Sequence, residues 1–256
     1  MHIITCIKSV IMDPPAGDIV RSEDLCELNP YDRPVLETAI GLRDTHGGRV
    51  TALSMGPDAS RAGLWEALAM GVDQGVLICD PALAGSDTLA TSTALSAAIK
   101  RLALFDLILF GIRTADSDTG QVGPQTAVLL EVPVVSQVHS ITYEPGGIRV
   151  ERTADGFMEV FEVSLPAALT VHSGAVEPRD IPLSGIEEAF AEDRLTVWSL
   201  EHLGLSPEAV GNSGSATRVI SMSKAQQGRT CNFLQGEAGE KAETLITRLC
   251  ESGMIG

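Results

Sequence analysis

The segment from Gly111 to Gln125, GIRTADSDTGQVGPQ, combines glycines, hydroxyl groups and two carboxylates directly after an apolar run. A helix is expected to begin near Gln121, where backbone N–H groups without intrahelical partners and the positive end of the helix dipole favour a phosphate. Gly120 and Gly123 allow close approach of the backbone, and Thr119 supplies a hydroxyl group. The spacing predicts nucleotide binding, but a capped loop with two turn-forming aspartates explains the same residues equally well.

The two aspartates of this segment, Asp116 and Asp118, could cap the helix or bind ribose hydroxyls. Because a carboxylate repels a phosphate, at least one of them should face a sugar, solvent or a backbone N–H. Two further segments are expected nearby: Asn29–Asp32, with Asn29 as the N-cap of a helix, and the helix start in Gly85–Ser92. Each alone is better explained as a helix cap, but both on one face favour a dinucleotide. Neither G-x-G-x-x-G nor a P-loop pattern occurs, which disfavours a standard Rossmann dehydrogenase or P-loop enzyme.

Alternating strands and helices in the first half must position these segments. Apolar β-rich runs predict the strands, and apolar residues at helical spacing predict the helices. The expected strands are Ile3–Val10, Val50–Met55, Gln74–Cys79 and Phe105–Gly111, and the expected helices are Pro30–His46, one around Leu64–Gly71, and Asp87–Ala103. This order favours right-handed crossovers, hence an α/β fold with a doubly wound, mostly parallel, Rossmann-like sheet of the adenine-nucleotide-binding type. Ligands of such sheets bind outside the carboxyl ends of the strands.

The second half changes in pattern. Short β-rich runs separated by turn signals predict a small antiparallel meander made of Val134–Thr142, Ile148–Thr153, Met158–Val163 and Ala167–Val171. Beyond it we expect a short helix near Gly185–Asp193 and a final helix over about Gly239–Glu251. Few aromatic residues follow Asp193, so we expect a nucleotide-binding α/β domain over 1–192 and a C-terminal arm over 193–256 that packs on a partner subunit.

Composition excludes several classes of protein. The 256 residues carry a net charge of −16, which argues against non-specific nucleic-acid binding and docking on anionic membranes. No run approaches the roughly 20 apolar residues of a transmembrane helix, and the first residues do not resemble a signal peptide. The five cysteines and five histidines are scattered without metal-ligand spacing, so neither a disulfide framework nor a metal site is expected. The expected location is the cytoplasm.

Several ordered segments together resemble the β subunit of electron-transfer flavoproteins over nearly the whole chain. They are Cys6–Lys8, Leu28–Asp32, Leu53–Pro57, Glu66–Asp73, Gly85–Ser92, Phe105–Gly111, Asp116–Pro124 and Leu165–Val171. The resemblance implies a heterodimer with an α subunit that holds the electron-carrying FAD. It also implies an adenine nucleotide in the β subunit, either a structural AMP or a second FAD.

The resemblance assigns a set of cofactor-binding residues in the segments described above. They are Cys6, Asn29, Pro30, Tyr31, Asp32, Met55, Asp87, Thr88, Thr91, Thr114, Ala115, Asp116, Ser117, Asp118, Thr119, Gly120, Gln121, Val122, Gly123, Pro124 and Gln125. The Asp87–Ser92 run and Gly214-Ser215-x-Thr217-x-Val219 resemble the electron-bifurcating branch, in which a β-bound FAD takes a hydride from NADH. Ser117 and Ala216 depart from the family pattern.

Three functions are consistent with these residues. The first is an electron carrier, with the flavin and no side chain performing the chemistry, that serves acyl-CoA-type dehydrogenases. The second is a subunit that holds AMP only for structure, with redox chemistry confined to the α subunit. The third, a stand-alone ATP-binding stress-type protein, is disfavoured because it has little use for a C-terminal arm.

A second matching segment concerns partners. Glu177–Leu183 matches the family's loop that contacts dehydrogenases, which implies that Leu183 is an exposed apolar anchor. A leucine covered by the chain's own arm is an equally good explanation of the same residue.

Overall fold

The computed structural model describes residues 1–12, 22, 24–102, 104–191, 193–220 and 231–255. Backbone contacts divide the chain into two compact units, Met1–Arg218 and Val219–Gly256. The first unit holds the sheet and every predicted site residue, and the second holds the last helix.

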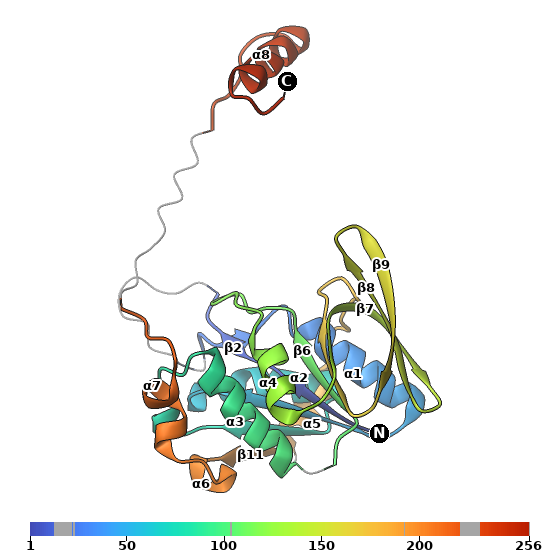
Figure 1. Ribbon diagram of the computed structural model, residues 1–256, viewed down its shortest axis with the longest axis vertical. Helices are drawn as coiled ribbons and strands as arrows, with labels where there is room; N and C mark the ends of the chain where they lie inside the picture. The colour runs from blue at the N-terminus through green and yellow to red at the C-terminus, as the bar shows by residue number, and fades with distance from the viewer. Residues whose placement is uncertain (13–21, 23, 103, 192, 221–230, 256) are drawn as a thin grey trace. The chain divides into compact units, whose positions relative to one another are not determined.

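A single mixed sheet organises the first unit (Figure 1). Among the described residues it has nine strands, in the spatial order β11 (Leu195–Trp198), β5 (Gln74–Ile78), β4 (Arg49–Met55), β1 (His2–Cys6), β6 (Leu107–Gly111), β10 (Ala167–Val171), β7 (Val134–Glu144), β8 (Gly147–Ala154) and β9 (Phe157–Ser164). Neighbours from β11 to β7 are parallel, whereas β7, β8 and β9 are antiparallel. The chain leaves β1 toward β4 and β5 and returns on its other side at β6, so the strand order reverses between β1 and β6. The carboxyl ends of these two strands are therefore the expected ligand crevice.

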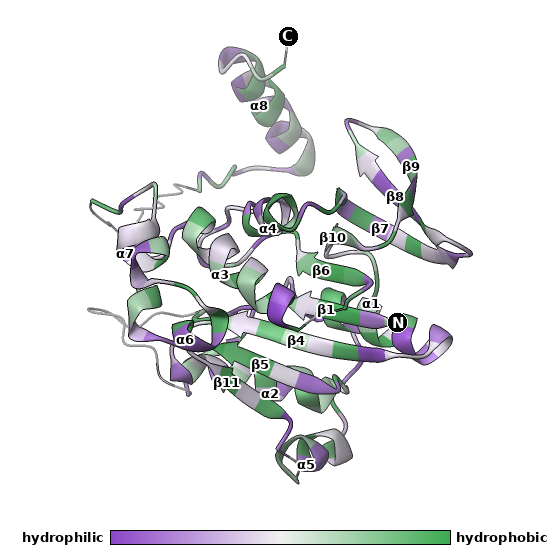
Figure 2. Ribbon diagram, turned by 60° about the horizontal axis from the view of Figure 1, so that its bottom comes forward, coloured by the Kyte–Doolittle hydropathy of each residue, from purple (hydrophilic) through white to green (hydrophobic). Residues whose placement is uncertain are grey.

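Helices cover both faces of the sheet (Figure 2). One face carries α1 (Arg33–His46) and α2 (Arg61–Met70), with α5 (Leu183–Ala191) packed on α2. The other carries α3 (Thr88–Arg101) and α4 (Val122–Leu130), with the short α6 (Leu200–Leu203) and α7 (Gly211–Gly214) beside α3. Figure 2 shows hydrophobic residues along β4, β5 and β6, as expected for strands buried on both faces.

The predicted doubly wound α/β fold is confirmed, but some strand assignments were wrong. The strand expected over Ile3–Val10 stops at Cys6, and β2 (Ser9–Val10) pairs separately with β3 (Glu27–Leu28). β10 was expected in the antiparallel meander, but it lies parallel between β6 and β7. Its residues are all buried, which is typical of a parallel strand covered on both faces and distinguishes it from the half-exposed meander.

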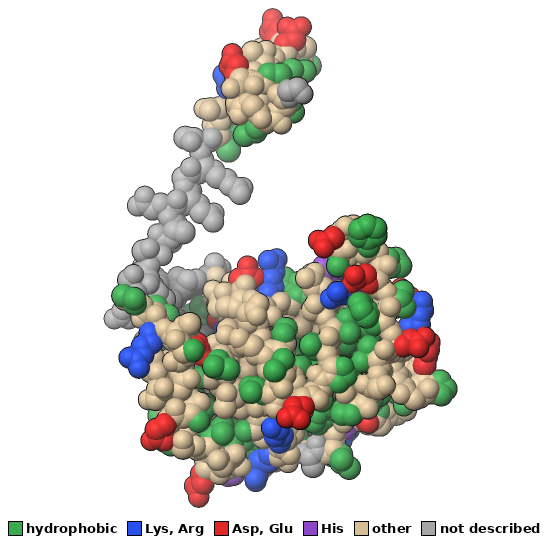
Figure 3. Space-filling view, viewed as in Figure 1, with side chains coloured by type: hydrophobic (Ala, Val, Ile, Leu, Met, Phe, Trp, Pro, Cys, Tyr) green, Lys and Arg blue, Asp and Glu red, His purple; other side chains and the backbone are tan. Residues whose placement is uncertain are grey.

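The meander itself, β7 to β9, projects from the sheet and carries exposed apolar side chains. Figure 3 shows hydrophobic side chains at the surface of this region. Phe157 and Met158 are 72% and 74% exposed at the start of the edge strand β9. The antiparallel pairing predicted for this region is confirmed for β7, β8 and β9.

The segment expected to form the arm, 193–256, contributes to both compact units. β11 joins the edge of the sheet beside β5, and Leu200 and Val210 are buried in the core, so the first compact unit extends to Arg218. The expected boundary at residue 192 and the expected helix end at Ala103 lie outside the described residues. In the second unit, α8 (Ala238–Glu251) exposes Leu245 and Ile246. That this segment packs on a partner stays a prediction. None of the helices in the described part of the chain is long and apolar enough to cross a membrane.

Candidate functional site

Asn29 ties together two loops at the carboxyl ends of β1 and β6. Its side chain is fully buried, and its Nδ2 donates to the carbonyl oxygen of Arg113 at 3.1 Å. Its Oδ1 accepts from the backbone N–H of Ala115 at 3.1 Å. Asn29 was predicted as the N-cap of the first helix, but α1 begins three residues later with Asp32 at that position. The amide side chain can bond both a carbonyl and an N–H, which explains its use as a clamp on the loop after β6.

Asp32 lies beneath the same junction. Asp32 is 3% exposed, and its Oδ2 accepts from the backbone N–H of Lys8 at 2.8 Å. Burial raises the pKa of Asp32 to about 7, against the opposing effect of the Lys8 hydrogen bond. A Cβ on Gly111 would lie 2.4 Å from Asp32 Oδ1, so the last residue of β6 must be glycine for this approach. Asp32 therefore joins the ends of β1 and β6.

The two aspartates after β6 face cations. Lys8 Nζ lies 2.7 Å from Asp116 Oδ2. Burial raises the pKa of Asp116, but the hydrogen bond and charge of Lys8 outweigh it and hold that pKa below its usual value. Asp118 is exposed, adopts a positive φ of 51° and lies 3.5 Å from an Arg113 nitrogen. Arg113 also covers the Tyr31 ring, 4.6 Å from its centroid. The loop thus holds cationic groups beside its carboxylates.

The N-terminus of α4 lies at the end of this loop. Gln121 is its N-cap and makes no side-chain capping bond. The N–H groups of Val122 and Gly123 have no hydrogen-bond acceptor among the described residues, and Pro124 has no N–H. Gly123 is buried, so these donors are not freely solvated. The expected helix start near Gln121 is confirmed, and the geometry suits an anionic group.

Gly123 has a different physical role from the one expected from sequence. A Cβ at this position would lie 3.1 Å from Phe110 Cγ and 3.1 Å from Thr170 Cγ2, both on the sheet. Its missing side chain lets α4 pack closely on β6 and β10, and it does not open a path to a phosphate. Gly120, with φ of 62° and its Cβ direction 2.9 Å from the Ile112 carbonyl oxygen, is required by the turn.

The N-terminus of α3 lies beside that of α4. Ser92 Oγ approaches the Val122 carbonyl oxygen at 3.2 Å, which fixes the two helices side by side. Asp87 caps α3 by accepting from the Ala90 N–H at 3.0 Å. Its other oxygen accepts from Thr217 N–H at 2.9 Å and from Thr217 Oγ1 at 3.0 Å. The two segments that resemble the bifurcating branch are therefore in direct contact.

Several other predicted residues lie at or near the carboxyl ends of the strands and the starts of α3 and α4, a region called the rim from here on. The hydroxyls of Thr88 and Thr91, on the first turn of α3, make no side-chain hydrogen bond to another described residue. Cys6 ends β1, and burial raises the pKa of its thiol, so it stays protonated. Met55 ends β4 and packs against the core formed with α3 and α4. Thr114 and Ser117 bond each other through their hydroxyls at 2.9 Å.

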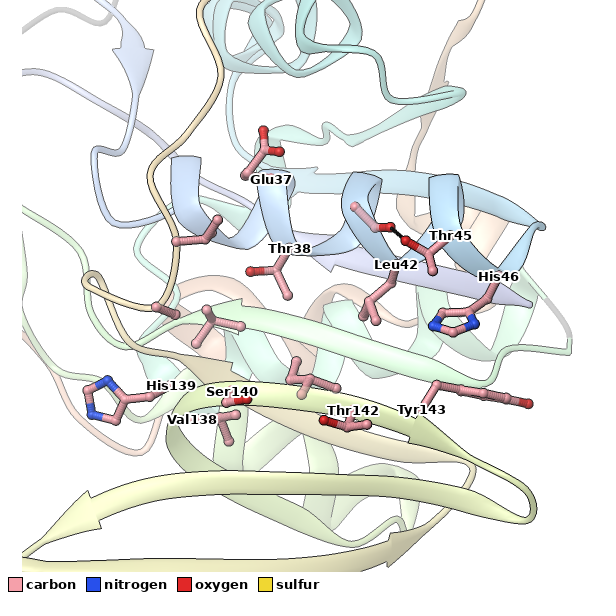
Figure 4. A pocket seen from close by; sticks show the side chains of 15 residues that line it. Glu37, Thr38, Leu42, Thr45, His46, Val138, His139, Ser140, Thr142 and Tyr143 are labelled. Carbon is pink, nitrogen blue, oxygen red and sulfur yellow. Dashed lines mark hydrogen bonds between the residues drawn. The ribbon is translucent and has the colours of Figure 1, made fainter.

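A separate cavity of about 510 Å³ lies between α1 and β7. Figure 4 shows Thr38, Leu42 and His46 of α1 facing Val138 and Tyr143 of β7. None of the predicted cofactor residues lines it. Sequence reasoning missed this cavity because its two walls are remote in sequence and neither carries a motif. No cluster able to hold a metal ion occurs in the described ranges.

Comparison with known proteins identifies the family. The family model described as "Electron transfer flavoprotein domain" matches residues 17–194. The caffeyl-CoA reductase-Etf complex subunit CarD of Acetobacterium woodii is 38% identical, with 100% of both chains covered. An electron transfer flavoprotein subunit beta of Thermoanaerobacterium thermosaccharolyticum is 35% identical over 97% of this chain and 98% of that protein. The acryloyl-CoA reductase electron transfer subunit gamma of Anaerotignum propionicum is 36% identical over 100% of both.

The chain belongs to the electron transfer flavoprotein family. The resemblance to its β subunits is thereby confirmed, and membership implies association with flavin in a complex. Leu183, the predicted partner contact, is 86% exposed as the first residue of α5.

Proposed function

We propose that this chain is the β subunit of a heterodimeric electron-transfer flavoprotein. With an α subunit that holds FAD, it passes electrons between acyl-CoA-type dehydrogenases or reductases and other redox partners. Family membership supports this function, as do the relatives whose names contain caffeyl-CoA reductase and acryloyl-CoA reductase. The five cysteines are free thiols, which supports a reducing compartment, the cytoplasm, as the place of action.

We further propose that the rim between α3 and α4 holds a second FAD. The observation that carries this proposal is the pair of amides, Val122 and Gly123, that have no acceptor in the described part of the chain and lie at the start of α4. Backbone donors at a helix start are suited to one phosphate. A single phosphate leaves the hydroxyls of α3 unused, whereas a pyrophosphate with a ribityl chain has groups for both helix starts. This contrast favours FAD over AMP.

The chain's own residues bind and orient the cofactor. A flavin held there would supply the redox chemistry, exchanging a hydride with NADH and single electrons with other partners. Asn29 fixes the loop that leads into α4, and Gly120 allows the turn before it. The Thr88 and Thr91 hydroxyls are available to bind the ribityl chain or pyrophosphate. No side chain is assigned a nucleophilic or acid–base role.

Cofactor content of the purified heterodimer tests both proposals. The chain is co-expressed with its α subunit, the complex is denatured, and released FAD and AMP are quantified per heterodimer. Two FAD support the proposal, whereas one FAD with one AMP restricts this chain to a structural nucleotide. Absence of any adenine nucleotide from this subunit contradicts the assignment of the rim.

A matched pair of variants locates the cofactor. Thr88→Val with Thr91→Val removes two free hydroxyls at nearly constant volume, and it should lower FAD retention while leaving any AMP in place. Thr93→Val is the control, because Thr93 lies on the same helix and its hydroxyl bonds the Leu89 carbonyl oxygen at 3.0 Å. Equal FAD retention in both variants argues against FAD at the start of α3.

A further inference from the structure

The loop after β10 is fixed to α1 by one arginine. Arg179 Nε lies 2.7 Å from Glu37 Oε2, and its Nη2 lies 2.9 Å from Glu37 Oε1. The backbone N–H of Arg179 also donates to Glu37 Oε2 at 3.1 Å. A bidentate arginine–carboxylate pair with an added backbone bond is more specific in geometry than an ordinary surface ion pair. The Glu37 side chain is only 14% exposed, so it holds the loop that carries Arg179 against α1.

The start of α5 is fixed independently to α2. A Cβ on Gly185 would lie 2.3 Å from the Ala69 carbonyl oxygen, so the two helices touch through backbone at this point. Further along, the Phe190 ring stacks on Trp65 with centroids 4.7 Å apart. Between Arg179 and Gly185 the chain has five residues, and the apolar side chain of Leu183 among them is 86% exposed. A short span attached at both ends holds this side chain in solvent.

We propose that Arg179 is a positioning residue for docking. Its bidentate ion pair with Glu37 holds the loop in the conformation in which Leu183 enters an apolar pocket of an acyl-CoA-type dehydrogenase. This inference rests on the proposed function. An anchor presented in its bound conformation loses less conformational entropy on association than one in a loose loop. Arg179 itself need not touch the dehydrogenase, because it acts through the position of Leu183.

Kinetics of the assembled heterodimer test the proposal. A purified acyl-CoA dehydrogenase for which the wild-type heterodimer serves as electron acceptor is assayed at varied heterodimer concentration. Arg179→Ala should raise KM for the heterodimer by roughly threefold to tenfold with kcat unchanged, an effect expected from lost preorganisation. Leu183→Ala should raise KM at least as much. Arg61→Ala is the control, because Arg61 pairs with the exposed Asp58 elsewhere on the surface and should leave KM unchanged.

A graded pair of variants separates positioning from a general loss of stability. Arg179→Lys keeps a cation beside Glu37 but loses the bidentate geometry, so its KM should lie between those of the wild type and Arg179→Ala, with flavin content constant throughout. Hydrogen exchange of the amides of 173–183 should be fastest in Arg179→Ala, intermediate in Arg179→Lys and slowest in the wild type. Wild-type KM in Arg179→Ala beside a raised KM in Leu183→Ala overturns the positioning role alone. Wild-type KM in both overturns the docking site, and absence of electron transfer in the wild type overturns the proposed function.

Discussion

The N-termini of α3 and α4 lie side by side, but their backbone donors are used in different ways. At α3 the carboxylate of Asp87 caps the helix and also binds Thr217, so the helix start holds another part of its own chain. At α4 no side chain caps the helix, and the amides of Val122 and Gly123 have no acceptor in the described part of the chain. The sheet topology places both helix starts at the ligand-binding edge, but only the uncapped one offers free amides to an anion.

The largest effect should come from breaking the support of the α4 loop. Asn29→Ala removes two buried hydrogen bonds and leaves the Arg113 carbonyl and the Ala115 N–H without partners. We expect a loss of about 3 kcal/mol in the free energy of unfolding and of most nucleotide from this subunit. Denaturant unfolding and nucleotide extraction measure the two effects.

A conservative variant at the same position sharpens this result. Asn29→Asp keeps the acceptor for the Ala115 N–H but replaces the donor to the Arg113 carbonyl with an oxygen. Because that carboxylate would also lie buried beside Asp32, Asn29→Asp should retain no more nucleotide than Asn29→Ala. Full nucleotide content in Asn29→Ala shows that the loop is held in place without this clamp.

The elements around the start of α4 could be predicted from the sequence, but the packing of Gly123 and the partners of Asn29 could not. The glycines and hydroxyl groups between Gly111 and Gln125 correctly indicated a strand, a loop and a helix start, because local propensity determines them. The direction of a missing side chain is set by packing, so the sequence could not show that the absent Cβ of Gly123 would point toward Phe110 and Thr170. Asn29 was misassigned as a cap because its true partners are 84 and 86 residues away.

The same distinction applies to the fold. The parallel order of β1, β4, β5 and β6 follows from their alternation with helices. β11 was missed because its four residues are a short run that gains stability only by pairing with β5. The cavity between α1 and β7 was likewise outside the reach of motif analysis, because it depends on how two remote elements pack.

A second prediction tests whether charge beneath the α4 loop matters. The pKa of Asp32 is raised by burial from 3.8 to about 7, so between these values the folded state binds more protons than the unfolded state. The free energy of unfolding should therefore decrease as pH rises through this range, by up to ~1.4 kcal/mol per pH unit from this group. Asp32→Asn should remove that slope, which denaturant titrations at several pH values measure. An unchanged slope in the variant shows that Asp32 is ionised in the folded state throughout.

A third prediction separates packing from ligand binding at α4. Gly123→Ala adds a Cβ at 3.1 Å from Phe110 and Thr170, and overpacking of about 1–3 kcal/mol is partly offset by better helix propensity. The melting temperature should fall by a few degrees while nucleotide content per folded heterodimer stays constant, since the Gly123 N–H is retained. Calorimetry and nucleotide extraction on the same sample check this. A selective loss of nucleotide without a change in melting temperature assigns Gly123 to the ligand site instead.

The smallest expected effect concerns the capped helix. Asp87→Ala leaves the start of α3 uncapped and removes both bonds to Thr217, which should cost about 1 kcal/mol, the usual value of an N-cap. Asp87→Asn keeps an oxygen for the Ala90 N–H and should cost less. Faster hydrogen exchange should appear at Thr217 in the alanine variant, with the amides of α4 unaffected. If the two helix starts respond together instead, the contact of Ser92 with Val122 couples them, and the capped and uncapped ends form a single binding unit.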